Sequence, residues 1–266
     1  MNKAENEVGV VSNTRRIVLK SGIATVLASM AGGLSPLANA SKPAEEQARG
    51  TVGDKPIVPE AFVYTELQIS VPFGKAPWQT VNRHLMRQPG LLNKTWLAGA
   101  GNDSLGGFYA FDSIENAQRF VTDYFPTEAK NLGAAQTTRI FDAVVVEEAS
   151  RDLGSPYFGI APTQTPGAFV YTEVQVSVPF DKAPWRKRNP VLKQQPGLLA
   201  KTWLSGLHTH TLGGIDVFDS VEHARRFALE DFPKTAKRLN AAFYTRVFDA
   251  NITERASRQM RSPYYV

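Results

Sequence analysis

The sequence predicts an α+β fold built from two tandem modules, each with the element order βαββαβ. One reason is a duplication, because a long stretch of sequence occurs twice without a gap. A second reason is that alternating apolar and polar residues give way to helical spacing at matching places in both copies. A third is the composition, because 42% hydrophobic and 21% charged residues over 266 positions suit two globular domains.

The duplicated stretches keep a constant offset along the chain. The pattern AFVYTE occurs at residues 61–66 and 168–173, and the pattern KTWL occurs at residues 94–97 and 201–204. A repeat of this length indicates two domains and not a solenoid. We therefore predict a first module at residues 61–157, a linker at residues 158–167 and a second module at residues 168–266.

Each element of the first module has its own signal. Apolar residues at every second position predict the first strand, and the sequence Asp112-Ser113-Ile114-Glu115 is typical of a helix cap. Pro126 interrupts the helix that follows this cap. The predicted elements, in order, are a strand from Val63, a helix at 77–87, strands at 91–97 and 106–111, the capped helix and a strand at 137–146.

This order is the ferredoxin-like split βαβ plan, in which the strand order 4-1-3-2 makes the first and last strands neighbours. The helices cover only one face of such a sheet. The other face is half apolar, so a second copy has to cover it by meeting it face to face or by closing with it into a barrel. We therefore expect a pseudo-dimer within one chain, and further pairing between chains stays open.

The sequence of residues 1–40 predicts a twin-arginine signal peptide. Arg15 and Arg16 precede an apolar residue, a Leu and a Lys, and small residues near Ala40 predict cleavage after it. The apolar stretch is too short and too polar for a comfortable membrane span, so no stable anchor is expected, with an uncleaved signal anchor as the alternative. The mature protein, with a flexible leader at residues 41–60, is expected in the periplasm or secreted, and its predicted partner is the twin-arginine translocase.

The composition excludes several classes of site. The chain has no cysteine, which excludes disulfides, thiolate metal sites and thiol nucleophiles. The net charge is only +5. The basic run Arg186-Lys187-Arg188 is interpreted as a solvated helix face. No nucleic-acid partner is therefore expected.

Four short patterns together resemble the YdhR-type family of proposed monooxygenases in the dimeric α+β barrel superfamily. They are QPGLLNKTW at residues 88–96, GGFYAF at 106–111, KNLG at 130–133 and RIFD at 139–142. The resemblance covers nearly all of each repeat and implies a barrel with a small pocket between helices and sheet in each half. It implies direct oxidation of aromatic substrates by dioxygen without a cofactor, although other relatives bind or degrade haem. The family has an acidic residue just before Gly-Gly, where this chain has Ser104-Leu105 and Thr211-Leu212.

Trp96 and Tyr109 are the candidate catalytic residues. An indole N–H holds a substrate oxygen while the ring stacks on an aromatic ligand, and a phenol donates to a developing oxyanion. The alternatives are core packing for Trp96 and Trp203 and a partly buried strand position for Tyr109. Trp203, Phe111 and Asp216 are expected to contact substrate. Because Asp216 stands where the first repeat has Tyr109, we expect the first repeat to hold the more competent pocket.

His208 and His210 occur only in the second repeat. A His-x-His pattern in a strand places both rings on one face, where they could bind a metal, and a solvated loop is the alternative. We predict no metal site and assign both histidines to a loop that covers the pocket and contacts substrate. Glu66 and Glu173 are interpreted either as catalytic acids or as ion pairs in the seam between the sheets, with Glu66 reaching Arg139.

These observations support two functional hypotheses. The first is an exported, cofactor-independent monooxygenase that acts on a small aromatic or quinol-like substrate. The second is a non-catalytic periplasmic binder of a small apolar ligand or haem, which the missing acidic residue and the Tyr109/Asp216 difference favour. RNA binding is a third reading of the βαββαβ order, and we reject it because Ile215-Asp216 interrupts the aromatic strand that it requires.

Overall fold

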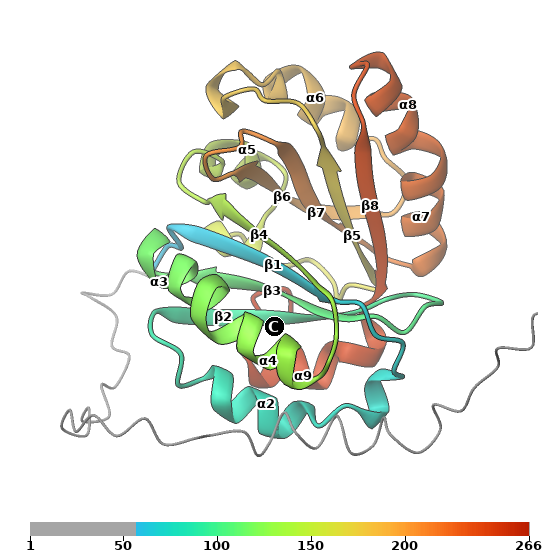
Figure 1. Cartoon of the computed structure of the whole chain (residues 1–266). Helices are drawn as coiled ribbons and strands as arrows, with labels where there is room; N and C mark the ends of the chain where they lie inside the picture. Colours follow the sequence, from blue (N-terminus) through green and yellow to red (C-terminus); the bar gives the residue numbers. More distant parts are fainter. Residues whose placement is uncertain (1–56, 266) are drawn as a thin grey trace, which may run out of the picture.

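The structure, a computed structural model, describes residues 57–265 (Figure 1). The predicted signal peptide and most of the predicted leader lie outside the described residues. The first repeat comprises β1 (Ala61–Leu67), α2 (Trp78–Leu85), β2 (Leu91–Ala98), β3 (Leu105–Phe111), α3 (Ile114–Arg119), α4 (Phe125–Asn131), β4 (Gln136–Asp142) and α5 (Glu147–Asp152). The second comprises β5 (Ala168–Val174), α6 (Trp185–Leu192), β6 (Leu198–Gly206), β7 (Leu212–Phe218), α7 (Val221–Arg226), α8 (Phe232–Arg238), β8 (Phe243–Asp249) and α9 (Glu254–Gln259).

Each repeat forms a four-stranded antiparallel sheet with helices on its outer face. The strand order is β2-β3-β1-β4 in the first repeat and β6-β7-β5-β8 in the second. In the first sheet, Val63 of β1 stands opposite Tyr109 of β3 on one side and Ile140 of β4 on the other. The predicted fold class, with two ferredoxin-like modules whose first and last strands are neighbours, is therefore confirmed.

The two sheets close into one barrel through two equivalent junctions. β4 pairs with β6, and the residue that follows β2 forms a bridge with β8. At the first junction the backbone N–H of Leu207 donates to the Ile140 carbonyl over 2.9 Å. At the second, the N–H of Ala100 donates to the Val247 carbonyl over the same distance. Figure 1 shows the sheet of the first repeat below that of the second repeat.

The barrel interior is an aromatic core that both repeats share. The equivalent residues Tyr64 and Tyr171 stack with ring centroids 4.0 Å apart and an interplanar angle of 7°. Tyr157 and Tyr264, each of which follows a Ser-Pro pair, meet edge to face at 5.4 Å. Because these rings are buried only when both sheets are present, the hydrophobic effect holds the repeats together.

The acidic residues of the seam pair across the two repeats. Arg246 Nε lies 3.2 Å from Glu66 Oε2, and Arg139 Nε lies 3.3 Å from Glu173 Oε2. The interpretation of these residues as seam ion pairs is confirmed, but the predicted partner of Glu66 is wrong. Within the first sheet Arg139 stands opposite Tyr64, and closure of the barrel brings the arginine of the other repeat to the carboxylate.

A long helical rod covers the outer face of each sheet. In the first repeat α3 continues through a π-helical turn, Phe120–Tyr124, into α4, and the second repeat has the same turn at Phe227–Asp231. Pro126 and Pro233 follow in the first turn after it, where a missing N–H is tolerated. The predicted interruption at Pro126 is therefore a change of helical pitch. Among residues 57–265, no helix has the length and apolar character that a membrane span requires.

The short helices α5 and α9 are exchanged between the repeats. α9 of the second repeat packs beside β2, where the N–H of Trp96 donates to Ser257 Oγ over 2.9 Å and the N–H of Lys94 donates to the Met260 carbonyl over 3.1 Å. α5 makes the equivalent bonds to β6. Each exchanged helix thus satisfies backbone donors of an edge strand that belongs to the other repeat.

The sequence did not predict these helices. The strand predicted at residues 137–146 ends at Asp142, because Asp142 Oδ1 accepts hydrogen bonds from the N–H groups of Val144 and Val145 and the chain turns there. Turns commonly contain an aspartate whose side chain accepts hydrogen bonds from the backbone N–H groups of the following residues. The residues after it, predicted as strand, lead into α5.

We predict that residues 57–157 expressed alone form a homodimer. Two copies can exchange α5 and close the barrel as the two repeats do, whereas a single copy exposes its aromatic sheet face and the edge of β2. Size-exclusion chromatography with light scattering measures the state. A soluble monomer with a cooperative unfolding transition would contradict the prediction.

Candidate functional site in the second repeat

The space between the outer helices and the sheet differs sharply between the two repeats. In the first repeat it is nearly closed, with a cavity of about 30 Å³. In the second repeat the equivalent cavity measures about 480 Å³. The larger volume falls within the range of small-molecule pockets, about 300–1,000 Å³. The shape of the pockets therefore opposes the expectation that the first repeat holds the more competent one.

Two tyrosines explain the difference. Tyr109 of β3 and Tyr124 of the π-helical turn line the first cavity. The equivalent residues of the second repeat are Asp216 and Asp231. Replacing two phenol rings with short carboxylates removes the side-chain volume that fills the first repeat, and the second cavity is open as a result.

The walls of the repeat-two cavity are mostly apolar. They come from β5, α6, β6, β7 and the helical rod, and the larger residues are Trp185, Leu192, Trp203, Leu212, Phe227, Phe232 and Leu239. Lys201 and Thr172 are the buried polar residues among them. An apolar enclosure with a few polar groups is the usual form of a small-molecule site.

Lys201 presents a buried charge to this cavity. Its Nζ lies 2.8 Å from Asp216 Oδ1, and Thr172 Oγ1 donates to Asp216 Oδ2 over 3.1 Å. Burial lowers the pKa of Lys201, while the Asp216 charge acts in the opposite direction. Asp216 was predicted to contact substrate; it stands opposite Lys201 in the neighbouring strand and does not line the cavity. The site therefore holds a neutral ion pair whose cationic end faces the cavity.

Lys94, the equivalent residue of the first repeat, has a different environment. It is 2% exposed, and its Nζ lies 3.0 Å from the centre of the Trp96 ring. No acidic group lies within ion-pair distance of it among residues 57–265. Burial alone lowers the pKa of Lys94 well below its usual value.

The two tryptophans predicted to hold substrate already use their indole N–H groups. Trp96 Nε1 donates to Asn82 Oδ1 over 2.8 Å, and Trp203 Nε1 donates to Asn189 Oδ1 over 2.9 Å. Each asparagine also donates to an exchanged helix, as Asn189 does to the Ala149 carbonyl over 2.9 Å. The indole rings line the cavities, but their N–H groups serve the packing of the helices.

Tyr109 and Phe111 belong to the packed outer core of the first repeat. Tyr109 OH accepts a hydrogen bond from Thr65 Oγ1 over 3.4 Å, and burial raises the pKa of the phenol. Phe111 packs against Phe120 with ring centroids 5.3 Å apart and does not line the cavity. The catalytic role predicted for Trp96 and Tyr109 stays a prediction, in a pocket that has little free space.

His208 and His210 lie in the exposed turn between β6 and β7. Their φ angles are 60° and 54°, so the residues are not in the extended strand that would place both rings on one face. Neither histidine side chain lines the repeat-two cavity, although the N–H of Val178, a residue of its lining, donates to the His210 carbonyl over 3.1 Å. The part of the chain that the structure describes has no group of three or more His, Asp or Glu residues that could hold a metal ion.

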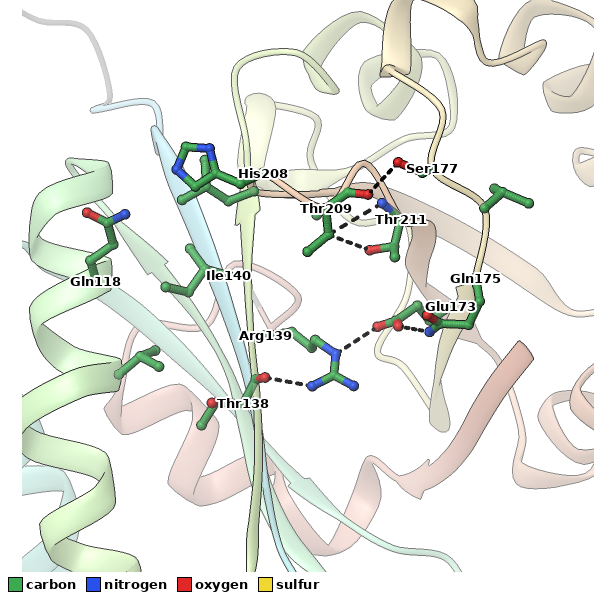
Figure 2. Close-up of a pocket in the computed structure, with 14 residues that line it drawn as sticks. Gln118, Thr138, Arg139, Ile140, Glu173, Gln175, Ser177, His208, Thr209 and Thr211 are labelled. Atoms are coloured by element: carbon green, nitrogen blue, oxygen red, sulfur yellow. Dashed lines mark hydrogen bonds and ion pairs between the residues drawn. The ribbon is translucent and has the colours of Figure 1, made fainter. Parts of the chain in front are cut away.

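His208 instead lines an open groove between the repeats, about 660 Å³ in volume (Figure 2). Figure 2 shows Arg139 reaching from β4 toward Glu173, and Gln175 donates to the same carboxylate from the other side. The polar groups at the bottom of the groove are therefore already bonded to each other. We accordingly place the candidate site in the enclosed cavity and not in the groove.

The repeat-two cavity does not fit a haem. Haem iron takes an axial ligand from His, Cys, Met or Tyr. None of the described residues that line the cavity is of these types, and the polar residues deepest in it are Lys201 and Thr172.

The sequence patterns did not indicate Asn82, Asn189 or the role of Lys201. Asparagine is the only polar residue that the two helices, α2 and α6, share at equivalent positions, which is a usable signal. Lys201 stands directly opposite Asp216 in the β6–β7 register, so a strand alignment would have paired them.

No family model matches the chain. No curated protein matches it either. Similar solved structures include an anthrone oxidase-like protein with 15% identity and a TM-score of 0.48, covering 71% of this chain and 90% of that one. A proposed monooxygenase from Lactobacillus acidophilus has 8% identity and a TM-score of 0.39, covering 71% and 93%. The chlorite dismutase of Candidatus Nitrospira defluvii has 6% identity and a TM-score of 0.41, covering 75% and 96%. Similarity at this level carries no conclusion about activity.

We predict opposite effects on stability for Lys94→Met and Lys201→Met. The first removes a buried amine without an acidic partner and raises the free energy of unfolding at pH 7 by about 1–3 kcal/mol. The second leaves Asp216 buried and unpaired and lowers it by about 3–5 kcal/mol. Urea unfolding of both variants, beside the unsubstituted protein, measures the difference.

The free energy of unfolding measured in this experiment should also depend on pH. The unfolded chain protonates Lys94 up to a pKa near 10.5, and the folded chain releases that proton at a lower pH. Between these two pKa values the unfolded state binds more protons, so the contribution of Lys94 makes stability rise with pH. Lys94→Met should remove this rise. An unchanged slope, or a loss of stability in Lys94→Met, would contradict the assignment.

Proposed function

We propose that the protein is a cofactor-independent monooxygenase that binds a small aromatic or quinol-like substrate in the repeat-two cavity. The observation that carries the proposal is the apolar cavity of about 480 Å³ with the amine of Lys201 on its wall. The resemblance of the two repeats to the YdhR-type family supports the same reaction class. The dimeric α+β barrel would then be used asymmetrically, with one open and one filled pocket.

The chemistry follows from the charge of Lys201. A cation held in an apolar cavity stabilises the oxyanion of a bound phenol or enol and so favours its deprotonation. The resulting electron-rich anion can transfer electrons to dioxygen. In a balanced reaction, an activated CH₂ group of the substrate becomes a carbonyl, one oxygen atom enters the product and the other leaves as water. The substrate supplies all four electrons, so no cofactor is needed.

A second candidate is a non-catalytic binder of a small apolar molecule. The hydrogen bonding of the site favours this candidate, because its polar groups already have partners within the protein. Trp203 donates to Asn189, and Lys201 pairs with Asp216. Both groups could hold a ligand in place without reacting. Either function requires the cavity to admit an apolar molecule.

Closing the cavity tests both functions. Asp216→Tyr with Asp231→Tyr gives the second repeat the tyrosines that fill the first, and it should reduce oxygen consumption with a panel of quinols and phenols at least about 100-fold. Binding of the neutral fluorescent probe N-phenyl-1-naphthylamine should be lost as well. Tyr109→Phe in the first repeat is the matched control and should change neither.

The outcomes separate the candidates. Oxygen consumption that the closing substitutions abolish supports the monooxygenase. Probe binding without oxygen consumption for any substrate supports the binder. A protein that binds no apolar probe in either form contradicts both.

We also propose that the chain is exported in the folded state by the twin-arginine route. The support is the sequence around Arg15 and Arg16, which lies outside the described residues. Arg15→Lys with Arg16→Lys should leave the precursor in the cytoplasm, as cell fractionation and immunoblotting would detect. Mature protein beginning at Ser41 in the periplasm of that variant would contradict the route.

A further inference from the structure

Two arginines converge at the repeat-two cavity. Arg188 of α6 and Arg238 of α8 both line it. Their Nη2 atoms donate to the same acceptor, Thr235 Oγ1, over 3.0 and 3.2 Å. Arg188 is half-buried and Arg238 is exposed, so the two guanidinium groups meet where the apolar walls reach solvent. The structure therefore holds two like charges side by side at the rim, and the exposed Lys187 of α6 also lines the cavity.

Within residues 57–265, neither arginine of this rim takes part in a direct ion pair. The nearby acids are already bonded, Asp216 to Lys201 over 2.8 Å and Asp231 to Lys234 over 3.3 Å. Burial, followed by the charge of Arg238, lowers the pKa of Arg188, while the charges of Asp216 and Asp231 act in the opposite direction. A bound anion would stabilise the charged form of Arg188 and reduce the repulsion between the two guanidinium groups.

The arginine pair belongs to the open cavity alone. The first repeat has Val81 and Asn131 at the positions of Arg188 and Arg238. Val81 lies among the packed residues of the closed pocket. One repeat therefore combines an open cavity with two arginines at its rim, and the other repeat has neither. This coincidence is expected if the cations recognise part of the molecule that fills the cavity.

We propose that the repeat-two cavity takes an amphipathic anion. An apolar aromatic body lies between the sheet and the helices, and one acidic group, such as a carboxylate, is bound by the guanidinium groups of Arg188 and Arg238. Guanidinium groups bind planar oxyanions through paired, charge-assisted hydrogen bonds. The inference rests on the proposed function only in requiring that the cavity admit an apolar molecule. It names the substrate class as an aromatic acid.

This mode of binding also fixes the orientation of the ligand. Lys201 is 4% exposed and lies deeper than the rim arginines. An acidic group held at the rim leaves the rest of the aromatic body to extend toward Lys201. A phenol or enol oxygen at the inner end would then meet the amine, whereas a neutral ligand could enter in either direction.

Two fluorescent probes that differ by one acidic group test the proposal. 8-Anilino-1-naphthalenesulfonate carries a sulfonate that N-phenyl-1-naphthylamine lacks. We expect the anionic probe to bind at least about tenfold more tightly, at one site per chain, because the guanidinium groups donate charge-assisted hydrogen bonds to its sulfonate. Arg188→Met with Arg238→Met should remove this preference and leave the affinity for the neutral probe unchanged. Lys237→Met, on the same helix but outside the cavity lining, is the matched control and should keep the preference.

A second measurement uses the unsubstituted protein alone. Raising the salt concentration should weaken binding of the anionic probe and leave the neutral probe unaffected, because exposed charges are screened. Equal affinities for the two probes, or a preference that survives the arginine substitutions, would overturn the inference while leaving the apolar cavity intact. If neither probe binds, the proposed function and this inference both fail.

Discussion

The edge strands β2 and β6 need partners that their own repeats do not supply. In each four-stranded sheet one edge carries backbone N–H groups that face away from the neighbouring strand. The exchanged helices satisfy them, through the Ser257 hydroxyl for Trp96 and the Met260 carbonyl for Lys94. The apolar inner face has the same requirement, which the Tyr64–Tyr171 stack and the crossed ion pairs meet. The exchanged helices, the tyrosine stack and the crossed ion pairs all depend on the other repeat, so neither sheet is complete alone.

This mutual dependence leaves the outer pockets free to differ. The barrel interior and the junctions involve both repeats, and a change there affects both. The space under each helical rod involves one repeat and the exchanged helix only. The first repeat fills that space with Tyr109 and Tyr124 and keeps Lys94 without an acidic partner. The second replaces the rings with aspartates, one of which neutralises Lys201, and gains both a cavity and a stable buried charge.

The fold could be predicted because it is indicated by short sequence patterns, and most of these patterns occur in both repeats. The two-residue periodicity, the capping sequence at residues 112–115 and the repeat itself each indicate the same arrangement, although the capping side chain is that of Ser113 and not the predicted Asp112. The site could not be predicted in the same way, because the size of a pocket depends on side-chain volume in three dimensions. Asp216 was the reason for expecting the more competent pocket in the first repeat, although Lys201 stands opposite it in the neighbouring strand and pairs with it. The short helices α5 and α9 were missed because their partners lie in the other repeat.

The exchange of helices also sets the order in which the protein can be completed. Chains are synthesised from the N-terminus, and domains often fold as they emerge. The first repeat here cannot do so fully, because the edge of β2 is covered by residues from Glu254 to Met260. Its backbone donors remain exposed until nearly the whole second repeat has been translated. The repeat that is made first is therefore among the last parts of the molecule to be finished, and a nascent chain stalled in the linker at residues 158–167 would present an open sheet edge to other chains.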